Sequence, residues 1–280
     1  MTGDEVAERV ASVRSRIAAA AVRVGRSPAD VQLVAVTKTV AVPLMQAAVA
    51  AGITAVGENR VQEAAAKVEK LQPPARAMRS YDDMGHEIAS LVKLGLPKNL
   101  ANKMAGDRYR QLPDDLVDAG RAVVEWHLLG HLQRNKAAVA ASLFDWIHSI
   151  DSATIAIAIG ERRHEDLPPV RALIEVDFTG IDTRMGVRDI DLAALTRAIA
   201  HQGGINVIGL MTVAPPGGPD VSRSAFARLR ALRDEIQQST GTALPHLSMG
   251  MSDDFEVAIE EGATMVRIGR AIFGERSPLG

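Results

Sequence analysis

A lysine closes the apolar run Val31-Gln-Leu-Val-Ala-Val-Thr-Lys38, and a helical pattern follows from Pro43. The β-branched and aliphatic residues predict a buried strand, and α/β proteins place ligand chemistry at the C-terminal ends of such strands. Partial burial there favours a neutral, nucleophilic amine, which can form a Schiff base with an aldehyde. The alternative is a lysine that simply ends the strand and reaches solvent.

Two glycine-containing turns are candidate anion sites. Ser248-Met-Gly-Met-Ser252 and Arg267-Ile-Gly269-Arg270 each join an expected strand to an expected helix. Glycine allows the backbone to approach a ligand closely, and the first N–H groups of a helix attract phosphate. We expect Ser252 to cap the helix that follows it. For each turn taken alone, an ordinary capped turn is the alternative.

The elements that would position these residues alternate along the chain. Strands are expected near 31–37, 54–57, 125–130, 146–150, 171–177, 206–211, 244–248 and 264–268. A helical pattern follows each of them, which predicts a (β/α)8 TIM barrel in one domain that spans residues 1–280. An open, doubly wound sheet is the alternative.

The alternation is interrupted once, between the second and third strands. Residues 72–123 begin with Gln72-Pro-Pro and contain short helical patterns without strands. We interpret this stretch as a largely helical insertion. Excursions of this length between barrel elements often form a lid or a contact surface.

A barrel would bring the strand ends to one face. The polar and flexible side chains expected there are Lys38, Asn59, His127, Met211, Ser248 and Arg267. They combine a nucleophilic amine with hydrogen-bonding groups and a guanidinium. For His127 and for His131 nearby, a structural role is as strong an interpretation as ligand contact. A metal site is not expected, because no His/Asp/Glu cluster has ligand spacing.

Composition narrows the classes of function. The chain has 280 residues, of which 47% are hydrophobic, and a formal net charge of -2. The balanced charge argues against nucleic acid or a membrane as partners. The absence of cysteine excludes disulfides, zinc-thiolate sites and a cysteine nucleophile. No apolar run approaches about 20 residues, and the acidic start lacks the features of a secretory signal, so we expect a cytoplasmic protein.

Six motifs, spread in order over the chain outside the insertion, resemble the pyridoxal phosphate (PLP) homeostasis proteins, single-domain relatives of the alanine racemase N-terminal barrel. They are Val36-Thr-Lys38, Gly57-Glu-Asn-Arg-Val-Gln-Glu63, Trp126-His-Leu-Leu-Gly-His-Leu-Gln-Arg-Asn-Lys136, Gly209-Leu-Met-Thr212, Leu247-Ser-Met-Gly-Met-Ser-Asp253 and Val266-Arg-Ile-Gly-Arg-Ala-Ile-Phe-Gly274.

The resemblance implies a set of PLP contacts. Lys38 would hold the cofactor as a Schiff base, Arg267 would face the pyridine nitrogen, Asn59 would lie near the ring, and Met211 would line the pocket. The phosphate would lie among Ser248, Ser252, Gly269 and Arg270, the last two through backbone N–H groups. This chain departs from the family at Arg270, where a small, often hydroxylic residue is usual.

The implied role is a carrier that holds PLP and passes it to PLP-dependent apoenzymes as a monomer or weak homodimer. Arg267 would disfavour a protonated pyridine nitrogen, so the ring would be a weak electron sink. An amino-acid racemase is the runner-up, and a cofactor-independent lysine aldolase is a weaker third reading. A racemase needs a second acid/base group, and the second domain that contributes it in alanine racemases is not expected here, since the chain ends soon after the eighth strand. Tyr81, Tyr109 or His86 would offer that group if the insertion folded over the cofactor; the alternative is that they pack within the insertion.

Overall fold

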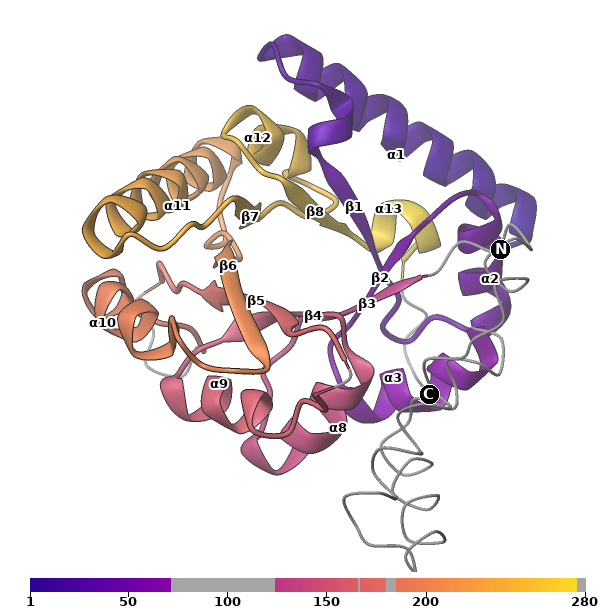
Figure 1. Ribbon diagram of the computed structural model, residues 1–280. Coiled ribbons are helices and arrows are strands. Elements are labelled where there is room, and N and C mark those ends of the chain that lie inside the picture. Colours follow the sequence, from indigo (N-terminus) through magenta and orange to yellow (C-terminus); the bar gives the residue numbers. More distant parts are fainter. Residues whose placement is uncertain (72–123, 166, 180–184, 276–280) are drawn as a thin grey trace, which may run out of the picture.

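The strands close into a barrel. A computed structural model describes residues 1–71, 124–165, 167–179 and 185–275. Within these ranges eight parallel strands follow one another around the barrel in chain order, and the last pairs with the first. Figure 1 looks along the barrel and shows helices surrounding the strands. The predicted (β/α)8 architecture is confirmed, and the open-sheet alternative is excluded.

Every expected strand is present, with ends that differ from the predicted ones by at most two residues. The strands are β1 Gln32–Val36, β2 Ala55–Glu58, β3 Glu125–Leu128, β4 Trp146–Ile150, β5 Val170–Glu175, β6 Ile205–Met211, β7 His246–Ser248 and β8 Met265–Ile268. The short 3-10 turns η1 Pro28–Asp30 and η2 Arg134–Lys136 precede β1 and α8 respectively.

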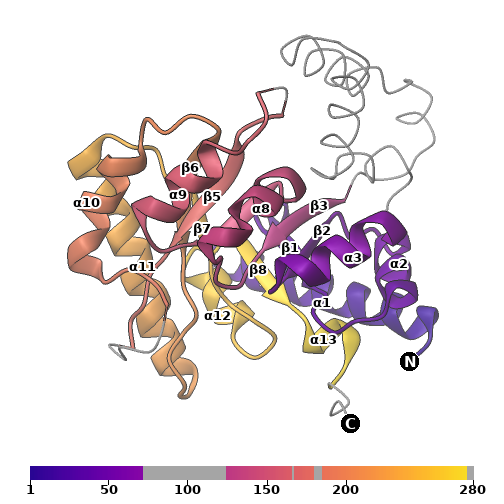
Figure 2. The same ribbon diagram turned by 90° about the horizontal axis from the view of Figure 1, so that it is seen from below.

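The helices form the outer layer. They are α1 Gly3–Arg23, α2 Val42–Ala50, α3 Val61–Leu71, α8 Ala137–Leu143, α9 Ala153–Gly160, α10 Asp189–Ile199, α11 Pro219–Thr240, α12 Phe255–Glu260 and α13 Arg270–Phe273. Figures 1 and 2 agree that α1 and α2 lie on one side of the barrel and α10 and α11 on the other.

Helix α1 shows how local sequence sets these boundaries. The Thr2 hydroxyl accepts a hydrogen bond from the Glu5 backbone N–H, and the Glu5 carboxylate accepts one from the Thr2 N–H. This is the capping box that the Thr-x-x-Glu spacing predicts. Val6, Val10, Val13 and Ile17 then recur on the buried face.

The barrel has an apolar outside and a partly polar inside. Trp126 and Leu128 belong to the large core between strands and helices. Because side chains alternate across a strand, His127 between them faces the barrel interior. A small separate cluster of Trp146, Leu173, Met211 and Met265 lies apart from the outer core. Polar side chains are therefore enclosed by the barrel itself.

The predicted insertion at 72–123 lies outside the described residues, and so do Tyr81, His86 and Tyr109. Its structure and the single-domain organisation of the chain stay predictions. None of the helices in the described ranges combines the length and apolar composition needed to cross a bilayer.

Candidate functional site at the mouth of the barrel

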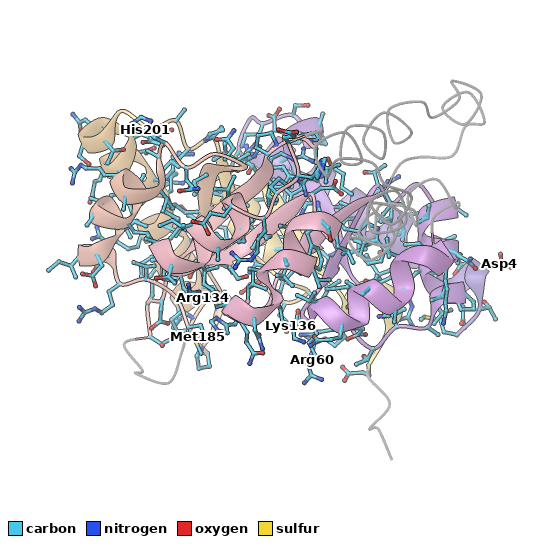
Figure 3. All side chains as sticks on the ribbon, turned by 60° about the horizontal axis from the view of Figure 1, so that its bottom comes forward. Asp4, Arg60, Arg134, Lys136, Met185 and His201 are labelled. Atoms are coloured by element: carbon cyan, nitrogen blue, oxygen red, sulfur yellow. The ribbon has the colours of Figure 1, made fainter. Side chains whose placement is uncertain are left out.

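The C-terminal ends of the strands form one face of the molecule. In Figure 3, Arg60, Arg134 and Lys136, which follow β2 and β3, lie along one edge, and His201, which precedes β6, lies at the opposite edge. Lys38 follows β1 by two residues and is half-buried on this face. The sequence prediction of a lysine at a strand end is confirmed.

The turn after β8 lies against the Lys38 segment. A Cβ placed on Gly269 would come within 3.3 Å of both the Cβ and the carbonyl oxygen of Val36. A larger residue at position 269 would press on the strand that leads to Lys38. The two candidate ligand-binding elements, the lysine and the Arg267-Ile-Gly269 turn, are therefore neighbours.

Both residues that flank Lys38 are held by side chains from the β2–α3 segment. Thr39 has a left-handed backbone (φ 63°), and its N–H donates to Glu63 Oε1 at 2.6 Å. The carbonyl of Thr37 accepts from Lys67 Nζ at 2.8 Å. A non-glycine residue at positive φ is costly, so the Glu63 contact stabilises an unusual turn directly after Lys38.

Lys67 is the centre of a cluster with Glu58 and Glu63, which we call the Lys67 clamp because it holds the residues on either side of Lys38. Its ammonium also donates to Glu58 Oε1 at 2.9 Å and to Glu63 Oε1 at 2.6 Å. Glu58 is fully buried and accepts from the Thr37 hydroxyl at 2.7 Å. Burial raises the pKa of Glu58, while the hydrogen bonds from Thr37 and Lys67 act against that rise. This cluster was not predicted from the sequence, although the Glu63–Lys67 spacing of four residues is a known helical ion-pair signal.

Arg267 is a buried cation close to the end of β8. Its side chain donates from Nη1 to Ser248 Oγ at 2.6 Å and from Nη2 to the carbonyl oxygen of Thr212 at 2.8 Å. Burial lowers the pKa of Arg267 to about 10, which still leaves the guanidinium charged at neutral pH. A guanidinium carries several more N–H donors, so these bonds fix its plane and leave donors for a ligand.

Ser248, at the end of β7, is fully buried. Its hydroxyl accepts from Arg267 and lies 2.9 Å from His148 Nδ1. It is therefore engaged with interior groups of the barrel. The sequence did not predict a role for Thr212, which follows β6, or for His148, which lies within β4.

Ser252 links the two glycine turns. Its hydroxyl accepts from the backbone N–H of Ala271 in α13 at 3.2 Å. The prediction that Ser252 caps the next helix is wrong: α12 begins at Phe255 with Asp254 at the N-cap position. Asp254 instead accepts from the Met251 N–H at 2.7 Å, which closes the turn and delays the helix start.

The Arg270 side chain is occupied by carboxylates. It forms an ion pair with Asp253 and lies 3.8 Å from Glu275, and nearly half of it, 48%, is exposed. Its backbone belongs to the first turn of α13, where N–H groups have no intrahelical acceptor. The backbone, not the guanidinium, is thus the part of Arg270 that is available to an anion at this turn.

Three further residues of the predicted site, Asn59, Met211 and His127, lie in different parts of the barrel. Asn59 directly follows β2, and its carbonyl oxygen would lie 2.3 Å from a Cβ on Gly130, so the loops after β2 and β3 pack tightly. Met211 ends β6 and packs in the small inner cluster. His127 is fully buried and hydrogen-bonded to His148, so the expectation that it lies at the mouth is wrong. His127 is the third of the four residues of β3, and its side chain points into the barrel interior.

His131 has a carboxylate partner, since its Nδ1 lies 2.9 Å from Asp151 Oδ2. Among the residues that the structure describes, no group of three His, Asp or Glu side chains is arranged to hold a metal ion.

Gly250 in the β7–α12 turn should not tolerate a side chain. Its φ is +92°, and a Cβ there would lie 2.6 Å from the Ala258 Cβ and 2.9 Å from the Phe255 Cα. We expect Gly250→Ala to lower the free energy of unfolding by about 3 kcal/mol in urea titrations. Gly241→Ala is the matched control, because Gly241 also has positive φ, +71°, but nothing lies within 4 Å. Its cost should be about 1 kcal/mol. Equal costs would show that the close contact is unimportant.

Comparison with known proteins agrees with this geometry. The family model described as "Alanine racemase, N-terminal domain" matches residues 10–277. The pyridoxal phosphate homeostasis protein of Escherichia coli strain K12 is 32% identical over 273 residues, which cover 98% of this chain and 97% of the relative. That of Pseudomonas aeruginosa is 35% identical over 272 residues, with 97% and 96% covered.

Solved structures give the same result. PipY of Synechococcus elongatus PCC7942, solved with PLP bound, aligns with a TM-score of 0.69 at 31% identity over 96% of this chain and 100% of that chain. Alanine racemase from Corynebacterium glutamicum shares the fold alone, with a TM-score of 0.57 at 20% identity over 98% of this chain and 62% of that chain. The chain belongs to the pyridoxal phosphate homeostasis protein family, within the larger family of the alanine racemase N-terminal domain.

Proposed function

We propose that this protein binds PLP through a Schiff base on Lys38 and serves PLP homeostasis, with little or no catalysis. The observation that carries the proposal is that Lys38 follows β1 while the buried, charged Arg267 lies on the neighbouring strand β8. A nucleophilic amine and a fixed cation suit the aldehyde and the ring nitrogen of one pyridine ligand. The relative solved with PLP bound supports PLP as the ligand.

The remaining residues fit the phosphate. Gly269 and Arg270 offer backbone N–H groups at the start of α13, and the Ser252 hydroxyl already contacts that turn. We propose these three as the phosphate contacts, with Asn59 near the ring and Met211 at the wall of the pocket. Ser248 is left out of the phosphate set, because its hydroxyl is engaged by Arg267 and His148.

Arg267 also explains why little catalysis is expected. When bound, PLP supplies an electron sink whose strength depends on protonation of the ring nitrogen. Arg267 stays charged at neutral pH and can only donate hydrogen bonds, so it disfavours a second positive charge beside it. The side chains of this site therefore bind and orient the ligand without strengthening the sink.

The test is an absorption spectrum of the purified protein incubated with PLP, recorded before and after borohydride, followed by peptide mass mapping. We expect a visible band that borohydride removes and a phosphopyridoxyl label on Lys38. A colourless protein that cannot be loaded with PLP would overturn the proposal. Exchange of an amino acid's α-proton into solvent at an enzymatic rate would overturn its non-catalytic part.

The finer proposals concern the cell. We propose that the protein is cytoplasmic, acts as a monomer or weak homodimer, and passes PLP to apoenzymes. Loaded protein, freed of excess PLP, should reactivate a PLP-dependent apoenzyme faster than free PLP is released into buffer. A reactivation rate equal to the release rate would argue against direct transfer.

A further inference from the structure

A row of polar side chains runs through the barrel interior and ends at Arg267. Arg267 Nη1 lies 2.6 Å from Ser248 Oγ, Ser248 Oγ lies 2.9 Å from His148 Nδ1, and His148 Nε2 lies 2.9 Å from His127 Nδ1. The side chains come from four different strands, and all are buried. Arg267 is the member of the row that we assign to the candidate ligand site.

The row continues toward a charged pair. His127 Nε2 lies 3.8 Å from Glu125 Oε2, and Glu125 accepts from Arg171 at 2.6 Å and from Gln32 at 2.9 Å. Burial would raise the pKa of Glu125, but the contacts with His127 and Arg171 outweigh burial and hold that pKa at about 2. A carboxylate thus faces the far end of the row.

The hydrogen-bond donors fix a direction along the row. An arginine can only donate, so Ser248 accepts from Arg267 and its own proton is available for His148 Nδ1. His148 then carries its proton on Nε2 and donates to His127 Nδ1. His127 in turn carries its proton on Nε2, the nitrogen that faces the Glu125 carboxylate. The opposite direction would leave a lone pair of His127 facing that carboxylate.

Both imidazoles are suited to this neutral arrangement. Burial lowers the pKa of His127, and burial together with the charges of His127, Arg267 and His246 lowers that of His148. The other charged groups that act on His127 are Glu125, Asp145 and Arg171. Each imidazole therefore acts as one donor and one acceptor, as the directed row requires.

We propose that His148 is a positioning residue which, through Ser248, fixes the orientation of Arg267 toward the ring nitrogen of bound PLP. This inference rests on the proposed function and deepens it. It gives Ser248 a role in the recognition of the ring, in place of a contact with phosphate.

The test compares ligands that differ at one end. PLP, pyridoxal without the phosphate, and a PLP analogue with carbon in place of the ring nitrogen are titrated against each variant by absorbance and fluorescence. Ser248→Ala should weaken PLP and pyridoxal by a similar factor of about 10 and leave the ring-carbon analogue nearly unchanged. Ser252→Ala should weaken PLP and leave pyridoxal nearly unchanged.

Variants of His148 form the second part of the experiment. His148→Leu removes the acceptor for the Ser248 proton and should weaken PLP about as much as Ser248→Ala, whereas His148→Asn restores an acceptor near Nδ1 and should recover most of the affinity. His201→Leu is the matched control on the opposite edge, where the histidine is exposed (Figure 3), and should change nothing. The visible band should shift in His148→Leu and Ser248→Ala and stay in place in the control.

Several outcomes would overturn the inference. Selective loss of PLP over pyridoxal in Ser248→Ala would return Ser248 to the phosphate. Equal loss of PLP and the ring-carbon analogue, or no loss at all, would remove the link to the ring nitrogen. Ser248→Ala creates only a small space and His148→Asn keeps a polar side chain at position 148, so these two variants decide the matter even where His148→Leu does not fold. Wild-type protein that fails to load PLP would instead refute the proposed function itself.

Discussion

Lys38→Ala is expected to abolish the visible absorption band and all borohydride-stable labelling by PLP. The side chain of Lys38 is the only proposed nucleophile at the mouth, and alanine cannot attack an aldehyde. The backbone around it should persist, because Thr37 and Thr39 are held by Lys67 and Glu63 through main-chain atoms. The measurement is quantitative mass mapping after borohydride, with circular dichroism to verify the fold.

Lys136→Ala is the matched control, since Lys136, like Lys38, is partly buried in a segment that follows a strand, and it has no proposed role. It should load and trap PLP as the wild type does. Lys67 should not replace Lys38, because its ammonium already donates to Thr37, Glu58 and Glu63. A variant without Lys38 that is still labelled at full yield would disprove the assignment of the nucleophile.

The fold and the position of Lys38 could be predicted because both depend on local patterns. Apolar strands alternate with helical periodicity along the described chain, and this order alone leads to parallel pairing around a barrel. A residue that follows a strand in such a fold lies at the mouth whatever its neighbours are. Lys38, Asn59 and the Gly269 turn were therefore located from sequence.

The direction of side chains within short strands could not be predicted as well. His127 and Ser248 lie at or near the ends of four- and three-residue strands, where a shift of one residue exchanges the interior for the outside. The sequence placed both at the mouth, and the structure engages both in the interior row. The row itself joins strands that are far apart in the sequence, and no local spacing encodes it.

The Lys67 clamp was missed for a related reason. Glu58 ends β2, Glu63 and Lys67 lie on α3, and Thr37 and Thr39 flank Lys38 on the other side of a strand–helix connection. Helical spacing could suggest the Glu63–Lys67 pair alone. Only the packing of α3 over the β1 end shows that the pair holds the backbone of the candidate ligand-binding segment around Lys38.

Lys67→Met should lower the free energy of unfolding by about 3–5 kcal/mol near neutral pH, because it leaves the carboxylate of Glu58 buried without a cation. It also removes the donors to the Thr37 carbonyl and to Glu63. The measurement is urea unfolding followed by circular dichroism. The control is Arg188→Met, which breaks an exposed ion pair with Asp191 and should cost less than about 1 kcal/mol. Equal costs would show that the clamp is not a buried electrostatic cluster.

The pH dependence of this loss identifies its cause. Burial raises the pKa of Glu58 in the folded protein, and removal of Lys67 removes a hydrogen bond and a charge that oppose the rise. When the pKa of an acid is higher in the folded than in the unfolded state, the folded protein loses stability as the pH rises from the acid's ordinary pKa, 4.5, through its pKa in the folded state. The cost of Lys67→Met should therefore be larger at about pH 8 than at about pH 5.

The double variant Glu58→Gln with Lys67→Met carries no buried charge at this position, so it should recover much of the stability and lose most of the pH dependence. Recovery follows only if the uncompensated carboxylate is the cause; if the double variant is as unstable as Lys67→Met at both pH values, the loss comes from packing and from the broken contact with Thr37.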